Sequence, residues 1–250
     1  MLTDIAIMVW KEWKELLQFQ GGKRSGLTGL VVMMLVFGIF MPIQWGDMWV
    51  ESAASLSLWV VIPLILVGTM VADSIAGERE RHTLETLLAS RLSDEAILLG
   101  KIAASVSYVW VVTQLVFVVA LIPVNVMHWD GRLLFYRPNV MMSGMLLSFL
   151  LACLMSSIGV LVSLRAGTVK QAQQTLGLSV FLLAYVVPMI GIYLLRFVPE
   201  ETRDRFFQPI FTGDITSIVV VASIILTFMS IGLYMAAKAR FQRSRLILDS

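Results

Sequence analysis

The sequence has little charge and almost no cysteine. Only 14% of its 250 residues are charged, whereas 58% are hydrophobic and the mean hydropathy is +0.84; soluble domains carry about 25% charged residues. This composition predicts an integral membrane protein with no room for a sizeable soluble domain. The net charge of +2 is too small to indicate nucleic acid as a partner. The single cysteine, Cys153, has no partner for an internal disulfide.

The sequence also lacks a phosphate-binding loop. The nearest match is Gly21-Gly22-Lys23-Arg24-Ser25. It has no preceding glycine, and no Ser or Thr stands directly after the lysine, as phosphate binding requires. We therefore expect that the chain is not an enzyme and holds no cofactor of its own.

Ionisable residues are scarce inside the apolar stretches. Gln114 and Asn125 are polar but neutral, and Asp73 falls near the end of its stretch. Proton- or sodium-coupled carriers need intramembrane groups that change charge, and metal-dependent membrane enzymes need clustered acids or histidines. The pattern argues against these classes and predicts no metal site. The 15 methionines are interpreted as flexible apolar filler.

Six apolar stretches are each long enough to cross about 30 Å of hydrocarbon. Backbone polar groups in lipid must be satisfied within each segment, so we expect helices. The fold class predicted is an all-α, integral membrane protein forming a single transmembrane domain over 1–250. The expected spans are 26–45, 53–76, 102–126, 139–164, 175–196 and 214–237.

Lysine and arginine gather on one side of this arrangement. They precede the first span, follow the second and fourth, and follow the sixth, whereas fewer lie in the alternate loops. The positive-inside rule then predicts a protein of the cytoplasmic membrane with both termini and the segment 77–101 in the cytoplasm. Aromatic residues are expected at the outer interface, namely Trp45, Trp49, Trp129 and Tyr136.

Two segments outside the spans are amphipathic. Residues 1–20 place Ile5, Val9 and Trp13 at helical spacing with lysines and glutamates on other faces, which predicts a helix in the inner headgroup layer. The extracytoplasmic segment 196–213 mixes acids, arginines and phenylalanines. A short helix dipping into the outer leaflet and a simple interfacial loop are both compatible with it.

A charged island, residues 77–101, separates the second and third spans. Arg81 and Glu85 are of opposite sign at helical spacing, and Ser93 is a plausible N-cap with Asp94 and Glu95 in the first turn after it. The residues alone leave open an ordinary solvated loop or a docking surface for a partner.

The island resembles the cytoplasmic loop of ABC-2 type permeases, the membrane subunits of ABC exporters such as the sodium-efflux and multidrug permeases. The resemblance rests on the run Glu78-Arg79-Glu80-Arg81-His82-Thr83-Leu84-Glu85-Thr86-Leu87-Leu88, then Leu92-Ser93 and Leu98-Leu99-Gly100-Lys101. The family pattern is roughly Glu-Arg-Glu-x-Gly-Thr-Leu-Glu-x-Leu-Leu, then Pro-Leu-Ser or similar, then Gly-Lys. His82 stands where Gly is usual, and Arg91 where Pro is usual.

The resemblance implies a coupling helix that docks on a separate ABC ATPase subunit, which would carry ATP and Mg. It also implies a second permease subunit, identical or related, with membrane lipids around both. The contact residues carried over to this chain are Glu78, Glu80, Thr83, Leu84 and Glu85. The substrate of such an exporter is not identified by the sequence.

Two other classes of protein remain open at this point. One is a secondary carrier or channel that needs no ATPase. The other is a non-transporting membrane scaffold or assembly factor with a permease-like fold. Copurification of an ATPase that depends on the charged island distinguishes both from an exporter subunit.

Overall fold

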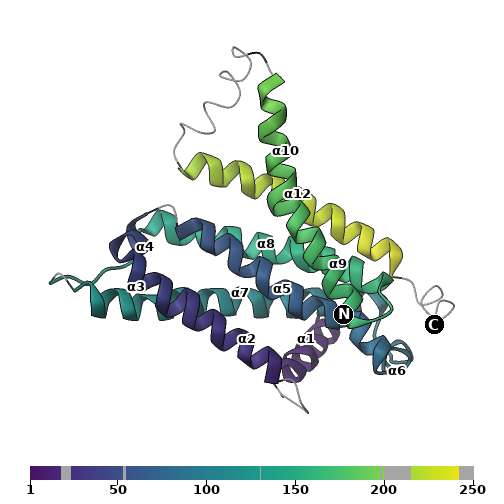
Figure 1. Cartoon of the computed structure of the whole chain (residues 1–250). Helices are drawn as coiled ribbons and strands as arrows, with labels where there is room; N and C mark the ends of the chain where they lie inside the picture. Colours follow the sequence, from purple (N-terminus) through teal and green to yellow (C-terminus); the bar gives the residue numbers. More distant parts are fainter. Residues whose placement is uncertain (18–23, 53–54, 130, 198, 200–214, 242–250) are drawn as a thin grey trace.

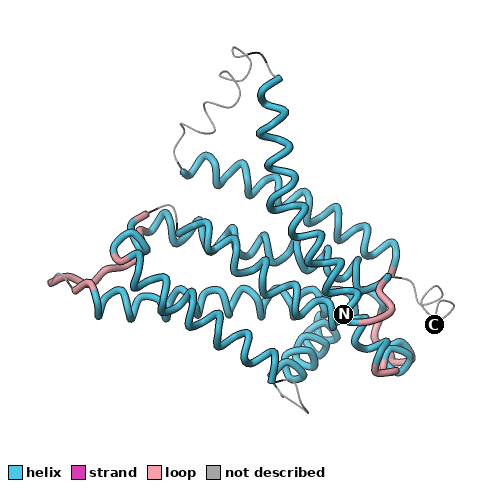
Figure 2. Tube along the Cα trace, viewed as in Figure 1, coloured by secondary structure: helices cyan, strands magenta, loops and turns pink. Residues whose placement is uncertain are grey.

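The computed structural model describes residues 1–17, 24–52, 55–129, 131–197, 199 and 215–241. All regular secondary structure in these ranges is helical, with loops and turns between the helices (Figure 2), which confirms the all-α prediction. The helices are α1 (Leu2–Leu17), α2 (Arg24–Leu35), α3 (Met41–Trp45), α4 (Asp47–Glu51), α5 (Ser55–Glu80), α6 (Leu84–Leu88), α7 (Asp94–Met127), α8 (Pro138–Arg165), α9 (Val169–Phe181), α10 (Val187–Leu194) and α12 (Ile215–Arg240).

Four helical segments are long and apolar enough to cross a membrane, and they match the first, third, fourth and sixth expected spans. They are Thr28–Trp45, Asp94–Met127, Pro138–Arg165 and Thr216–Arg240. The second expected span falls on α5, whose stretch Ser55–Val67 is apolar but shorter. The fifth falls on the helical run that contains α9 and α10. The total of six spans stays a prediction.

Helices α2, α3, α5, α7 and α8 lie side by side in one elongated bundle (Figure 1). Helix α6 lies at one end of the bundle, near α1, and α4 lies at the other (Figure 1). Helix α12 packs on α8, whereas α10 projects away from the bundle. Of the expected extracytoplasmic segment 196–213, only Arg196, Phe197 and Pro199 are among the described residues.

Close packing of α5 on α8 depends on two glycines of α8. A Cβ on Gly144 would lie 2.4 Å from the Trp59 ring, and a Cβ on Gly159 would lie 2.5 Å from Val71 Cγ1. Small residues let membrane helices approach closely and gain van der Waals contact. The structure shows that Gly159 packs within the chain.

Aromatic side chains fill the bundle interior at the α4 end. The Trp59 ring stacks on Phe117 with 3.9 Å between ring centroids. Trp49 Nε1 donates a hydrogen bond to Tyr136 Oη at 2.8 Å, and that hydroxyl donates to Phe117 O at 3.0 Å. Trp49 and Tyr136 are therefore buried. The expectation that they face the interface was wrong, because their polar atoms find partners inside the bundle.

Two of the helical runs contain a single π-helical turn, and each turn comes just before a proline. The turns are Val36–Phe40, before Pro42, and Leu182–Val186, before Pro188. Proline removes one backbone donor and clashes with the preceding turn, and a wider π turn accommodates both effects. Pro63 and Pro123 lie inside α5 and α7 without an adjacent π turn.

The close contact at Gly159 predicts that a glycine-to-alanine substitution destabilises the protein there but not at Gly177. Gly159→Ala is expected to lower the free energy of unfolding by about 1–3 kcal/mol, because its methyl group collides with Val71. Gly177→Ala on α9 is the control, because nothing lies within 4 Å of its added Cβ. Thermal unfolding in detergent measures both. Equal effects of the two substitutions would contradict the close packing of α5 on α8.

Candidate functional site

The charged island forms a turn, a short helix and the start of a long helix. The turn at residues 81–83 interrupts the helix that the spacing of Arg81 and Glu85 predicts. Helix α5 ends at Glu80, α6 spans Leu84–Leu88, and α7 begins at Asp94. Ser93 is the N-cap of α7, and its Oγ accepts a hydrogen bond from the backbone N–H of Ala96 at 3.2 Å. This confirms the predicted cap. In Figure 2 the loop segments on either side of α6 leave it at the tip of the bundle.

The chain turns between α5 and α6 at His82. Its φ is +55°, in the left-handed region that favours glycine, and among the described residues it is the one non-glycine with positive φ. Thr83 closes the turn, since its N–H donates to Glu78 O at 2.9 Å. This left-handed backbone explains why the family pattern has glycine at this position. His82 adopts the same backbone conformation, so the turn is kept.

Glu78 lies inside the protein rather than at the surface. Its Oε1 is 2.9 Å from Lys11 Nζ of α1 and 3.0 Å from Lys101 Nζ of α7. Lys101 is itself almost fully buried, and its ammonium also contacts Glu12 Oε1 at 2.9 Å and donates to Ser74 O at 2.7 Å. We call Lys11, Glu12, Glu78 and Lys101 the buried charge cluster.

The buried charge cluster is electrically balanced. It pairs two ammonium groups with two carboxylates, which offsets the large cost of removing each charge from water. Burial alone lowers the pKa of Lys11, but the carboxylates of Glu78, Glu12 and Glu15 outweigh burial and raise that pKa above its usual value. Lys11 therefore stays protonated at neutral pH. The cluster holds α1 against the ends of α5 and α7.

Helix α1 is fastened to α7 by packing as well as by charge. Met8 is buried, and a Cβ on Gly100 would lie 2.5 Å from the Met8 Cβ. Trp13 Nε1 donates to Ser107 Oγ at 2.9 Å, and its ring lies edge-on to Tyr108. Absence of a side chain at Gly100 thus lets α1 lie directly on α7.

Arg79 links the end of α5 to the end of α8. Its Nη1 donates to Ala166 O at 2.7 Å and its Nη2 to Leu164 O at 3.2 Å. These carbonyls belong to the C-terminal end of α8, where a helix leaves acceptors unpaired and its dipole favours a cation. The guanidinium therefore serves as a cap supplied by a different helix.

Glu80 links the same end of α5 to the start of α9. Its Oε2 accepts a hydrogen bond from the Val169 N–H at 3.2 Å. Val169 is the first residue of α9, where free N–H groups and the helix dipole favour a carboxylate. Glu78, Arg79 and Glu80, which we call the root triad, thus contact α1 and α7, then α8, then α9.

One further ion pair connects the loop region to α12. Lys238 Nζ lies 2.6 Å from Glu95 Oε1 in the first turn of α7. Both side chains are roughly half exposed, so solvent screens the pair and it contributes little to stability. The ion pair holds the end of α12 beside the start of α7.

The five residues expected to contact a partner differ in their exposure to solvent. Glu80, Thr83 and Glu85 lie at the surface, whereas Glu78 and Leu84 are buried. Leu84 anchors α6 on the hydrophobic core. The contact role of the three exposed residues stays a prediction. No group of three His, Cys, Asp or Glu side chains that could hold a metal lies within the described part of the chain.

Sequence reasoning missed the partners of the root triad. Lys101 was interpreted as a cytoplasmic positive charge and as part of the loop pattern, and Lys11 and Glu12 as part of the charged N-terminal segment. The sequence contains one indication that Lys101 is buried, because this lysine lies between the apolar pairs Ile97-Leu98 and Ile102-Ala103. A lysine in such a setting needs an acid nearby.

The buried charge cluster predicts unequal costs for losing two lysines. Lys101→Met is expected to lower the free energy of unfolding by about 3 kcal/mol, because Glu12 and Glu78 lose a buried counter-charge. Lys14→Met, at an exposed position of α1, is expected to change it by less than about 0.5 kcal/mol. Thermal unfolding in detergent compares them. A Lys101→Met variant as stable as Lys14→Met would rule out the cluster as a stabilising element.

Comparison with known proteins agrees with the sequence pattern of the loop. Residues 40–206 match the family described as ABC-2 family transporter protein, and this range contains the whole charged island. A curated relative, the ABC transporter permease protein NatB of Bacillus subtilis (strain 168), is 28% identical over 155 residues. That match covers 57% of this chain and 39% of the relative's length.

The family match extends over more than half of the chain, and it agrees with the long apolar helices of the fold. The protein is therefore a membrane protein, and its chain belongs to the ABC-2 family of transporter proteins.

Proposed function

We propose that this chain is the membrane-spanning permease subunit of an ATP-driven ABC exporter in the cytoplasmic membrane, moving a substrate that is not identified. The observation that carries the proposal is the root triad. Three consecutive residues at the base of one loop contact four different helices. A displacement of that loop therefore reaches most of the helical bundle at once.

The proposed docking surface is the exposed side of α6 and of the turn before it. Thr83, Glu85 and Thr86 are exposed there, and α6 lies at the tip of the bundle (Figure 1). Leu84 holds the other side of α6 against the core. A helix that is anchored on one face and free on the other suits contact with a separate subunit.

The partner in this proposal is an ABC ATPase, and ATP and Mg belong to it. The chain itself then performs no catalysis and holds no cofactor. Two permease subunits, identical or related, enclose the substrate path, and two ATPases complete the transporter. Support for these partners comes from the family, whose members are transporter proteins, and from the name of the relative, an ABC transporter permease protein.

Helix α1 acts as the interfacial brace in this proposal. Its inward side carries Met8 and Trp13, whereas Ile7 and Trp10 are exposed on other sides. A helix with apolar residues both toward the bundle and away from it suits the headgroup layer. The lysines and arginines near both ends of the chain favour a cytoplasmic location for both termini and α6.

The structure changes the role that we propose for Glu78. A buried carboxylate paired with Lys11 and Lys101 is not available to another subunit. We propose that Glu78 transmits movement from the loop to α1 and α7, while Glu80, Thr83 and Glu85 lie near the contact. Of the exposed acids, Glu85 is the better probe, because Glu80 also binds α9.

Copurification from native membranes tests the docking surface. Glu85→Lys is expected to reduce the amount of ATPase that copurifies about tenfold or more, because it reverses a charge at the centre of a contact. Asp47→Lys makes the same reversal at an exposed position in α4, at the opposite end of the bundle, and is expected to have no effect.

The outcomes separate the exporter subunit from the two other classes of function. If Glu85→Lys retains as much ATPase as the native chain, α6 is not the docking surface. If an ATPase is absent even from the native chain under mild conditions, the exporter proposal fails. A secondary carrier and a membrane scaffold would then be the remaining interpretations.

A further inference from the structure

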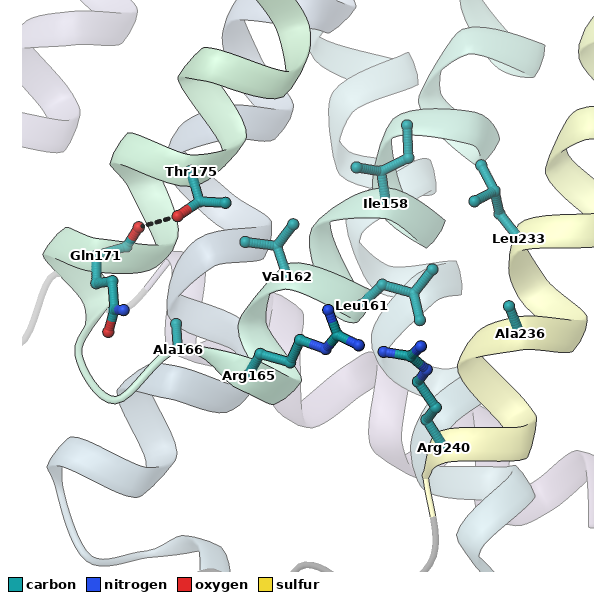
Figure 3. Close-up of a pocket in the computed structure, with 10 residues that line it drawn as sticks. All are labelled: Ile158, Leu161, Val162, Arg165, Ala166, Gln171, Thr175, Leu233, Ala236 and Arg240. Carbon is teal, nitrogen blue, oxygen red and sulfur yellow. Dashed lines mark hydrogen bonds between the residues drawn. The ribbon is translucent and has the colours of Figure 1, made fainter.

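A cavity of about 340 Å³ lies between α8, α9 and α12, close to the ends of α8 and α12 (Figure 3). Its apolar wall includes Ile158, Leu161 and Leu233. Arg165 of α8 and Arg240 of α12 also line it, and in Figure 3 their guanidinium groups point toward each other across it. None of the lining residues is acidic.

Arg165 and Arg240 are exposed at the ends of α8 and α12, and they differ from the three paired cations near the root triad. Lys11 and Lys101 have carboxylate partners, and Arg79 donates to backbone carbonyls. Within the described part of the chain, neither Arg165 nor Arg240 has an ion-pair or hydrogen-bond partner. Two facing guanidinium groups without a counter-charge repel each other, and an anion between them removes that repulsion.

A third donor lies on the α9 side of the cavity. Gln171 Oε1 accepts a hydrogen bond from the Gly167 N–H at 3.0 Å, which fixes the side-chain amide and leaves its Nε2 group as a donor. Thr175 Oγ1 donates to Gln171 O at 2.9 Å, shown by the dashed line in Figure 3. The cavity therefore joins several donors to an apolar wall.

We propose that this cavity binds a phospholipid with an anionic headgroup, such as phosphatidylglycerol. The phosphate lies between Arg165 and Arg240, whose planar guanidinium groups suit phosphate oxygens. An acyl chain lies along Ile158, Leu161 and Leu233. Both arginines stand at the end of a helix long enough to span the membrane, which is the depth of lipid headgroups.

The apolar wall favours a lipid over free phosphate. Inorganic phosphate gains nothing from hydrocarbon side chains, whereas an acyl chain buries apolar surface against them. The bound lipid contacts α8, α9 and α12 together, so it would stabilise the arrangement of these three helices. This site goes beyond the proposed function, because lipid binding needs no ATPase.

Native mass spectrometry of the purified full chain tests the site, after incubation with equal amounts of phosphatidylglycerol and phosphatidylcholine. The native chain is expected to retain phosphatidylglycerol preferentially. Arg165→Gln and Arg240→Gln are each expected to reduce that retention roughly tenfold, because each removes a charge-assisted hydrogen bond. Lys170→Gln is the matched control, since Lys170 is exposed near the same end and does not line the cavity.

A second variant tests the cavity rather than the charge. Ala236→Phe fills the cavity without changing any charge, and it is expected to reduce phosphatidylglycerol retention as strongly as Arg240→Gln. Circular dichroism and gel filtration confirm that each variant keeps the native fold. In the native chain, millimolar inorganic phosphate is expected to leave lipid retention unchanged.

Three results would overturn the proposal. If Lys170→Gln loses as much lipid as Arg165→Gln, the binding is diffuse surface attraction. If Ala236→Phe retains the lipid, nothing enters the cavity. If inorganic phosphate displaces the lipid, the arginines form a site for free phosphate. None of these results bears on whether an ATPase docks on α6, so the two proposals fail separately.

Discussion

The arrangement of this protein depends on pairing two buried charges, Glu78 and Lys101, with the more exposed Lys11 and Glu12 at one end of an otherwise apolar bundle. Lys11, Glu12, Glu78 and Lys101 come from α1, α5 and α7, and each charge inside the bundle would be very costly alone. The requirement for pairing fixes where α1 crosses α7 and where α5 ends. The close packing of α1 on α7 at Gly100 depends on the same alignment.

The same end of the bundle is where function is proposed, and its construction suits transmission of movement. The root triad is held by ion pairs and by helix-end hydrogen bonds, so the base of the loop cannot shift without moving several helices. Helix α6, in contrast, is anchored by Leu84 and exposes its other side. In the proposed function, a rigid base beneath an exposed helix passes the movement of the ATPase partner into the bundle. Arg165 and Arg240, which have no ion-pair partner within the described part of the chain, mark a second region, where we propose that an anionic lipid supplies the counter-charge.

The sequence predicted those features that depend on local pattern. The helical ranges follow from apolar stretches, and the Ser93 cap follows from the residue types around it. The burial of Glu78 was not predictable in the same way, because its partners lie 67 and 23 residues away along the chain and periodicity carries no such information. Trp49 and Tyr136 were misplaced for a similar reason, since each satisfies the other's polar atom inside the bundle. The meaning of His82 as a departure from the glycine of the family pattern became clear only from its backbone angle.

Hydrogen exchange measured by mass spectrometry on Glu78→Gln tests most directly whether the buried charge cluster fastens the loop to α1. The substitution keeps the size of the side chain and removes its charge, so Lys11 and Lys101 both lose a partner. Faster exchange is predicted in residues 1–17 and in the loop 81–93, with unchanged exchange in the middle of α8. Faster exchange confined to the residues next to position 78, with α1 as protected as in the native chain, would contradict the account.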